Sequence, residues 1–372
     1  MIRLNPQAGP HVRNPGKVPS LMAMVIMALL PATLFGIYLF GLPALNTVVL
    51  CLLSAAFFEA LCVWLVKKRI SLVLFDGSAL LTGLLLALTL PPWAPWWIAV
   101  GGSGFAIIVG KHVYGGLGQN PFNPAMLARV ALLLSFPLQM TSWISPAPLF
   151  SATTPGFADA LAITFNGTIN SAINSAMPLD GFSSATLLGQ VKTDLGQGQT
   201  LSLIFEGQYN LLFNSLGYTA GSLGETSALL IAAGGIYLIW QGVINWQLPV
   251  SMLASVALLA GLFHVIDPEL YASPLYHLSS GALMLGAFFI LTDPVTSPAT
   301  LRGQILFGGG CGLLVFIIRT WGGYPEGVAF AVLLMNGMTP LIDHYLKPRQ
   351  YGRNRRGQPL PMPDLTPPGE QS

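Results

Sequence analysis

Long apolar runs separated by short polar segments make up most of this chain. Many runs approach 20 residues, the length with which an α-helix crosses the hydrocarbon core of a bilayer. The segment 139–220 differs, because it is rich in Ser, Thr, Asn and Gly and predicts a long loop with short helices near 156–165 and 199–213. The pattern predicts an all-α polytopic membrane protein. Its ten spans are expected near residues 21–41, 44–66, 71–90, 95–110, 123–138, 225–244, 249–266, 277–292, 304–318 and 326–346.

Composition supports the membrane assignment. Of the 372 residues, 53% are hydrophobic and 8% are charged, whereas about a quarter of the residues in a soluble domain are charged. The first run, LMAMVIMALLPATLFGIYLFGL, is too long for a signal peptide and no small-x-small cleavage site follows it, so a true span is expected. The cysteines Cys51, Cys62 and Cys311 fall singly in apolar runs, which favours ordinary membrane packing over a disulfide or metal site.

The basic residues predict the orientation, because cytoplasmic segments hold an excess of Lys and Arg. With the N-terminus inside, all but two of the 16 basic residues are expected on the cytoplasmic side. The two exceptions are Lys192 and Arg319. Both termini are then cytoplasmic and the loop 139–220 faces the outside. The residues assigned to the cytoplasmic side are Arg3, Arg13, Lys17, Lys67, Lys68, Arg69, Lys111, Arg129, Arg302, Lys347, Arg349, Arg353, Arg355 and Arg356.

The two halves of the chain resemble each other. SALLTGLLLALTLPP from Ser78 aligns with GALMLGAFFILTDP from Gly281, and GGSGFAIIVGK aligns with GGCGLLVFIIR, which pairs Lys111 with Arg319. Each half has five predicted spans, an odd number, so the repeats are inverted across the membrane and are expected to enclose a site near its midplane. The predicted parts are an N-terminal arm (1–20), a first repeat (21–138), the external loop (139–220), a second repeat (221–346) and a basic, proline-rich, disordered tail (347–372).

A hydroxyl-rich string in the external loop, DGFSSATLL, is the first candidate for chemistry. Thr186 is expected to be an exposed secondary hydroxyl among small residues that let an enzyme or a phosphate approach closely. A modification site and a plain polar loop are both compatible with the residues alone. The earlier string LFSATTPG lacks a preceding acid, which makes Thr153 and Thr154 poor candidates.

The order of residues in DGFSSAT resembles the D-G-x-[ST]-x-A-T signature at which a flavin transferase attaches FMN to threonine through a phosphoester bond. The signature occurs in the family of the B subunit of the sodium-pumping NADH:quinone oxidoreductase and the D subunit of the Rnf complex. The resemblance implies FMN on Thr186, with Ser184 at a position that is often Gly. The remaining matches to the attachment motif are Asp180, Gly181, Ser183 and Ala185.

Other segments extend this resemblance over 15–355. YGGLGQNPFNPAMLARVALLLSFP and GGYPEGVAFAVLLMNGMTPLIDHYLKPRQYG look like the Rnf protein, and MLGAFFILTDPVTSP fits both relatives. The resemblance implies an electron-transfer subunit in the inner membrane of a bacterium, not catalytic alone. Its complex would couple electron transfer between ferredoxin and NAD to translocation of Na⁺ or H⁺.

The partners implied by the resemblance are the other Rnf subunits (A, B, C, E and G), above all the G subunit with its own external FMN, and the flavin transferase. Membrane lipid surrounds the chain, and no nucleic acid partner is expected. Binding of NAD by this chain is not expected either, because GGSGFAIIVG lies in a span rather than between a strand and a helix. Relatives also hold a noncovalent riboflavin, for which Pro91, Asn120–Pro124 and Asp293–Pro294 would form walls here.

The ionisable residues of the spans have competing interpretations. Glu59, the most deeply placed acid, is either part of an ion pathway or a member of a buried pair with an unidentified cation. Ser222 and Glu225 match a capping box, favoured over a helix end that holds flavin phosphate. His112 is expected at the surface, Asp76 and Asp293 suit helix caps, and no cluster suggests a metal site.

Two rival functions remain open at this level. A five-plus-five inverted repeat is also the architecture of urea transporters, so a channel or transporter is one alternative. A quinone-reducing protein of the NADH:quinone oxidoreductase type is the other. A covalent flavin would exclude the channel, and the identity of the partner subunits would separate the two oxidoreductases.

Overall fold

The computed structural model describes residues 18–68, 73–151, 154–166, 183–184, 186–205, 217–347 and 358, and this part of the chain is almost wholly helical. The first half contains two long helices, three shorter ones and a π-helical turn, followed by a single helical turn. These elements are α1 (Val18–Phe40), α2 (Leu42–Leu65), α4 (Ser78–Thr89), α5 (Trp96–Ile107), η1 (Ile108–His112), α6 (Pro124–Ser135) and α7 (Pro137–Met140).

The second half repeats this order of elements, with different lengths. A 3₁₀ turn precedes it, and the segment equivalent to α4 is divided into an α-helical and a π-helical piece. The elements are η3 (Leu223–Glu225), α13 (Ala228–Trp240), α14 (Gln247–Ile266), α15 (Pro274–Ser279), α16 (Leu283–Leu285), η4 (Gly286–Ile290), α17 (Leu301–Trp321) and α18 (Val328–Tyr345).

Helices occupy all ten predicted spans, with two clear departures from the prediction. Four helices (α1, α2, α14 and α17) are long and apolar enough to cross a membrane, and α4, α6 and α13 are shorter apolar helices. The third span is shorter than predicted, and the eighth is broken between α15 and α16, where Gly281 has a positive φ of 70°. The piece after the break continues from α16 directly into η4. The prediction of an all-helical, multi-pass membrane protein is confirmed.

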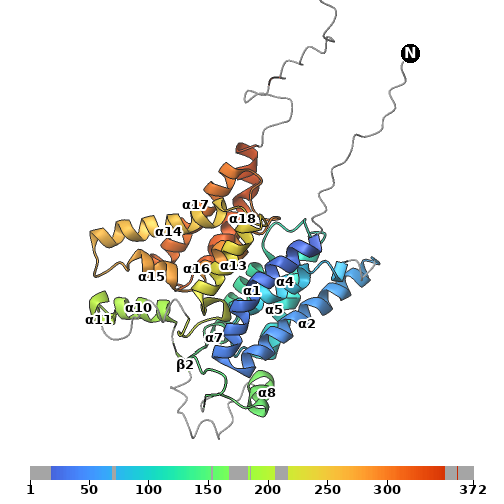
Figure 1. The fold of residues 1–372 in the computed structure, drawn as a ribbon, viewed down its shortest axis with the longest axis horizontal. Helices are drawn as coiled ribbons and strands as arrows, with labels where there is room; N and C mark the ends of the chain where they lie inside the picture. Colours follow the sequence, from blue (N-terminus) through green and yellow to red (C-terminus); the bar gives the residue numbers. More distant parts are fainter. Residues whose placement is uncertain are drawn as a thin grey trace, which may run out of the picture.

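The connection between the halves forms short elements on one side of the molecule (Figure 1). They are β1 (Trp143–Ile144), α8 (Phe157–Asn166), β2 (Ser183–Ser184), α10 (Leu187–Gly196) and α11 (Leu201–Phe205), so helices lie near both predicted positions in the loop. In Figure 1, α8 lies at the bottom and α10 and α11 at the lower left, whereas α18 ends at the top and α1 begins at the upper edge of the first half. The two ends of the described helical body therefore share the side opposite to the loop.

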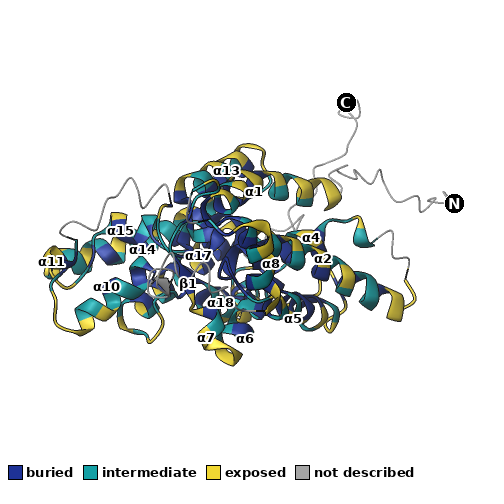
Figure 2. Ribbon diagram, turned by 90° about the horizontal axis from the view of Figure 1, so that it is seen from below, coloured by how far each residue is buried: buried dark blue, intermediate teal, exposed yellow. Residues whose placement is uncertain are grey.

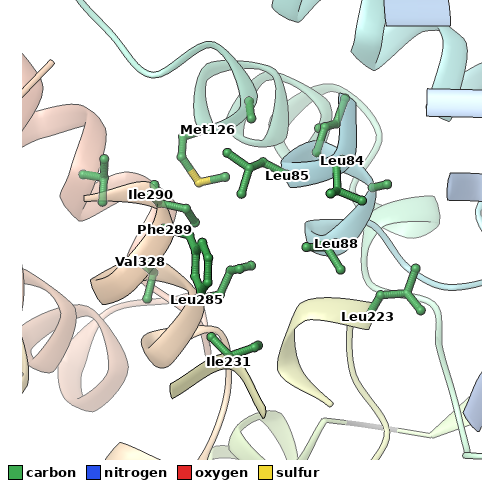
Figure 3. Close-up of a cluster of buried hydrophobic side chains, with 14 of the residues drawn as sticks. Leu84, Leu85, Leu88, Met126, Leu223, Ile231, Leu285, Phe289, Ile290 and Val328 are labelled. Carbon is green, nitrogen blue, oxygen red and sulfur yellow. The ribbon is translucent and has the colours of Figure 1, made fainter. Parts of the chain in front are cut away.

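The core lies between the short helices of the two halves. Leu84, Leu85 and Leu88 of α4 face Leu285 and Phe289 of the second half (Figure 3). Around this core the outer faces of the helices carry exposed apolar side chains, and Figure 2 shows the buried residues gathered toward the centre. Exposed apolar faces on long helices are what a lipid solvent requires.

Glycines allow the second half to pack tightly. Gly308 and Gly312 of α17 face α14, where a Cβ atom would lie 2.7 Å from the carbonyl oxygen of Leu248 and 2.5 Å from that of Met252. This small-xxx-small spacing lets two membrane helices approach until backbone contacts backbone. A side chain at either glycine would separate α14 from α17.

Candidate functional site

Thr186 begins helix α10 and caps it. Its backbone is extended, and its Oγ1 atom accepts a hydrogen bond of 3.1 Å from the N–H of Gly189. The residue is only 8% exposed. The expectation of an exposed hydroxyl is therefore wrong for this conformation, because the cap turns the hydroxyl toward the helix and packing covers it.

Packing and a half-buried amine hold α10 against the second half. Leu188 and Val191 pack in one cluster with Tyr276 of α15. The Nζ atom of Lys192 donates to the carbonyls of Ile318 (3.2 Å) and Arg319 (3.0 Å) at the end of α17 and to that of Tyr324 (3.1 Å). Partial burial lowers the pKa of Lys192, and its three carbonyl contacts fix the position of the helix that Thr186 starts.

The attachment motif is also paired with β1, which lies in the connection just after α7. Strand β2 runs antiparallel to β1, with Ser184 opposite Trp143 and Ser183 opposite Ile144. Of the other motif residues, Asp180, Gly181 and Ala185 lie outside the described residues. Thr186 thus follows a strand that is paired with β1 and begins a helix that is anchored to the second half.

A small cavity of about 70 Å³ adjoins Thr186. Charged side chains from three elements line it: Arg129 of α6, Glu225 of η3 and Glu326 before α18. Aromatic side chains of Trp143, Tyr324 and Phe330 complete the wall. The cavity can hold a phosphate group but not a three-ring isoalloxazine.

These residues fit a phosphoester on Thr186. The first turn of the ten-residue helix α10 presents backbone N–H groups and the positive end of its dipole to any anion on the Thr186 oxygen. On the opposite side, the Nη1 atom of Arg129 is buried and has no hydrogen-bond partner among the described residues. Both groups favour a negatively charged substituent at this hydroxyl.

The predicted capping box at Ser222 and Glu225 is wrong. Helix α13 begins at Ala228, and its cap is Ser227, whose Oγ accepts from the N–H of Leu230 at 3.2 Å. Ser222 instead donates to the Glu225 carboxylate at 2.9 Å. The side chain of Glu225 lines the Thr186 cavity and does not cap the helix. Packing against distant segments, rather than the local S-x-x-E pattern, therefore determines where this side chain lies.

The structure also corrects the side assigned to Arg129. The basic-residue count placed it with the cytoplasmic segments, yet it lines the Thr186 cavity on the loop side. Its guanidinium lies 6.0 Å from the centre of the Trp143 ring, and Trp143 follows α6 and α7. The long side chain of Arg129 places its guanidinium near the end of α6 that leads into α7. The position of a residue along a predicted span does not reveal this direction.

A second polar site surrounds Glu59 of α2, next to the start of α4. Glu59 is fully buried, and its Oε1 atom lies 2.7 Å from Nζ of Lys111. The same Nζ donates to Ser78 Oγ at 2.7 Å, and Ser78 Oγ donates to Asp76 at 2.5 Å. Lys111 therefore supplies the cation for the buried-pair interpretation of Glu59.

His112 is not the surface residue that was predicted. It lies in the π-helical turn η1, and its Nε2 atom is 3.1 Å from Oε2 of Glu59 with a poor angle for a hydrogen bond. The turn is where α5 widens, so Lys111 and His112 both face α2. Asp76 matches its prediction, because its carboxylate accepts the N–H of Ser78 at the start of α4.

A cavity of about 430 Å³ lies beside the Lys111 site. Apolar residues of α1 and α4, together with apolar residues at and just beyond the end of α13, form a large part of its wall, and Ser78, Lys111 and Asn120 form a polar part. Of the predicted walls of a flavin site, Asn120, Asn123–Pro124 and Asp293–Pro294 line it. Pro91 does not, because it follows the far end of α4 from Ser78.

Sequence reasoning missed Lys111, Arg129 and Glu326 as site residues. Each is a charged residue within or beside an apolar helix, where ionisable side chains are costly and mark sites. That signal alone would have selected them. The remaining cysteine prediction agrees with the structure, since Cys51, Cys62 and Cys311 form no disulfide.

Comparison with known proteins gives a consistent family. The model of the NQR2, RnfD, RnfE family matches residues 5–352. A protein of Stutzerimonas stutzeri, named as the D subunit of an ion-translocating oxidoreductase complex, is 54% identical over 343 residues, 92% of this chain and 94% of the relative. Proteins of the same name from Halorhodospira halophila (50% identity; 95% of this chain, 97% of the relative) and Escherichia coli (46%; 94% and 98%) are also similar.

These relatives match nearly the whole length of the chain. The resemblance inferred from the sequence motifs is thereby confirmed at the level of the family. The chain belongs to the NQR2, RnfD, RnfE family.

Proposed function

We propose that this chain is the D subunit of an Rnf-type ion-translocating oxidoreductase complex and that it carries FMN on Thr186. The full-length match to relatives of that name carries the first part. The second part is supported by the DGFSSAT string and by the position of Thr186 as the cap of α10. When bound, FMN supplies one- and two-electron redox chemistry, which no side chain of the protein can supply.

The residues of this chain position the flavin and exclude water. β2 and α10 fix the position of Thr186. The residues that line the 70 Å³ cavity would hold the phosphoester. The chain passes electrons onward and is not catalytic alone, as expected of one member of a larger complex.

The proposed topology has ten spans in two inverted repeats, with both termini cytoplasmic and Thr186 on the outer side of a bacterial inner membrane. The common side of the first and last helix ends, opposite to α10, supports this topology (Figure 1). So does the equivalence of α4 with α16–η4 and of α5 with α17 in the aligned repeats. In this orientation the external FMN of the G subunit is the electron donor.

The partners follow from this assignment. The other subunits (A, B, C, E and G) complete a path between ferredoxin and NAD, and a flavin transferase modifies Thr186. The complex couples the electron transfer to movement of Na⁺ or H⁺. A role of Glu59 in the ion path remains part of the proposal, although its contact with Lys111 favours a structural pair.

The 430 Å³ cavity is the proposed site of a second, noncovalent flavin of the riboflavin type. Its volume falls in the range of small-molecule sites, and its wall is largely apolar with a few polar groups at one end. Lys111, Asn120 and Asn123 offer donors for a flavin carbonyl. The site lies at the opposite end of α4 from the Thr186 loop.

The test of the covalent flavin is fluorescence after denaturation. The chain is expressed with a flavin transferase, denatured, separated on a gel and inspected for flavin fluorescence. We expect a fluorescent wild-type band and none for Thr186→Val. Thr154→Val, in the similar SATT string, is the matched control and stays fluorescent. A dark wild-type band, with the transferase active on another substrate, would reject FMN attachment to this chain.

The second flavin is tested by counting. Acid precipitation of the purified chain releases noncovalent flavin and leaves covalent flavin in the pellet. We expect one equivalent in each fraction for the wild type, and one released equivalent with none in the pellet for Thr186→Val. A supernatant free of flavin from protein purified in mild detergent would contradict the assignment of the 430 Å³ cavity.

A further inference from the structure

Arg129 is a charged residue in the middle of α6, and one of its hydrogen-bond donors has no acceptor in the part of the chain that the structure describes. Its Nη1 atom is buried and lacks a hydrogen-bond partner among the described residues. Its guanidinium carbon lies 6.0 Å from the centre of the Trp143 ring. A buried donor without an acceptor is costly, so such a group in a native protein calls for an explanation.

The direction of the side chain points to Thr186. Arg129 and Thr186 line the same 70 Å³ cavity. The path through the chain is also short, since the Trp143 that Arg129 covers is paired with Ser184, two residues before Thr186. The fold thus brings a cation from the first half to the hydroxyl at the start of α10.

The acids of the cavity are already engaged elsewhere. Glu326 forms an ion pair of 3.0 Å with Arg319, and Glu225 accepts a hydrogen bond of 2.9 Å from Ser222. Within the described residues, neither carboxylate lies within ion-pair distance of Arg129. The guanidinium therefore has donors available for an anion that enters the cavity from Thr186.

We infer that Arg129 is the positioning residue that binds the phosphoester of the flavin attached to Thr186. The inference rests on the proposed function and adds a second residue to the site. A phosphodiester carries one negative charge and two free oxygens, which match the planar fork of a guanidinium. The backbone N–H groups at the start of α10 would also bind the phosphoester.

The experiment measures whether the stabilisation of the protein by the attached flavin requires Arg129. Wild type and Arg129→Gln are produced with and without the transferase, and attachment is checked by in-gel fluorescence. Thermal unfolding of the four full-length proteins then gives the increase in Tm caused by the flavin in each background. A ³¹P NMR spectrum of each modified protein reports the environment of the phosphoester directly.

We expect flavin attachment to raise the Tm of the wild type by about 2 °C or more. In Arg129→Gln, attachment should give only a small part of that increase, and the ³¹P resonance should be shifted. Arg302→Gln is the control: it removes a positive charge from an exposed position in the first turn of α17, away from the cavity lining, so it leaves the increase and the resonance unchanged.

A modified Arg129→Gln protein with the wild-type resonance and the full increase in Tm would overturn the inference and leave the proposed function intact. Absence of fluorescence in the wild type would instead overturn both. Should Arg129→Gln fail to accumulate, Arg129→Lys decides the matter. It keeps the charge but loses the bidentate fork, so an unchanged ³¹P resonance in that variant overturns the inference.

Discussion

Two buried cations occupy equivalent positions in the two halves of the molecule. In the first half, Nζ of Lys111 contacts Glu59 of α2 and the hydroxyl of Ser78, the first residue of α4. In the second half, Arg319 contacts Glu326 and donates to the carbonyls of His277 (2.8 Å) and Ser280 (3.0 Å), just before α16. Each cation ties the start of the broken or shortened helix of its own half to a neighbouring segment.

The two pairs differ in how far they are sealed from solvent. The side chains of Lys111 and Glu59 are 2% and 0% exposed, whereas Arg319 is 1% and Glu326 24% exposed. Glu326 also lines the Thr186 cavity. The buried ion pair of the first half, Lys111 with Glu59, is therefore sealed from solvent, and we call it the closed pair. The pair of the second half, Arg319 with Glu326, is the open pair, because Glu326 is partly exposed and forms part of the wall of the candidate cofactor site.

Breaking the closed pair should have the largest effect on stability. Glu59→Gln removes the ionic partner of Lys111 at a fully buried site, and breaking a buried pair costs about 3–5 kcal/mol. We expect a large drop in Tm, measured by intrinsic fluorescence in detergent. The double variant Glu59→Leu, Lys111→Met should regain part of the loss, because no charge remains buried. A Tm for Glu59→Gln equal to that of the wild type would show that the pair of Glu59 and Lys111 does not stabilise the fold.

A Cβ atom at Gly281 should disturb the open pair nearly as strongly. Gly281 has a φ of +70°, and a Cβ there would clash with Oε2 of Glu326 and lie 2.8 Å from Nη2 of Arg319. Backbone strain of about 1–2 kcal/mol adds to a displaced charged hydrogen bond of about 1.5–3 kcal/mol. We expect Gly281→Ala to lose about 2.5–5 kcal/mol of stability in the same melting assay.

Gly242 offers a matched control for that prediction. Its φ of +69° is nearly the same, but nothing lies within 4 Å of a Cβ atom. Gly242→Ala should therefore carry the strain alone and lose about 1–2 kcal/mol. Equal losses in the two variants would show that the contact with Arg319 and Glu326 contributes nothing.

The positions of the spans were predictable because hydropathy depends on local composition. Helix α14 was predicted at 249–266 and is Gln247–Ile266, and α17 was predicted at 304–318 and is Leu301–Trp321. The break in the eighth span was not predictable in this way, since apolar residues continue through it. A single glycine conformation at Gly281 decides the break, and hydropathy is insensitive to φ.

The polar sites were predictable only in part. Thr186 was selected by a motif that resembles those of known relatives, and attachment of FMN there stays a prediction. The pairing of Glu59 with Lys111 joins residues 52 positions apart, so no local pattern could reveal it. At Ser222 and Glu225, a valid local pattern was overridden because Ser227 caps α13 and leaves Glu225 free to face the cavity.

Neutralising the acid of the open pair should have the smallest effect of the three. In Glu326→Gln the guanidinium of Arg319 keeps its bonds to the carbonyls of His277 and Ser280, and the amide oxygen can still accept one bond. Water screens the partly exposed carboxylate, so we expect a loss of about 1 kcal/mol, measured in the same melts. A loss equal to that of Glu59→Gln would mean that the second pair is as closed as the first. The two halves would then share one anchor of the same strength, and the exposure of Glu326 beside Thr186 would have no energetic consequence.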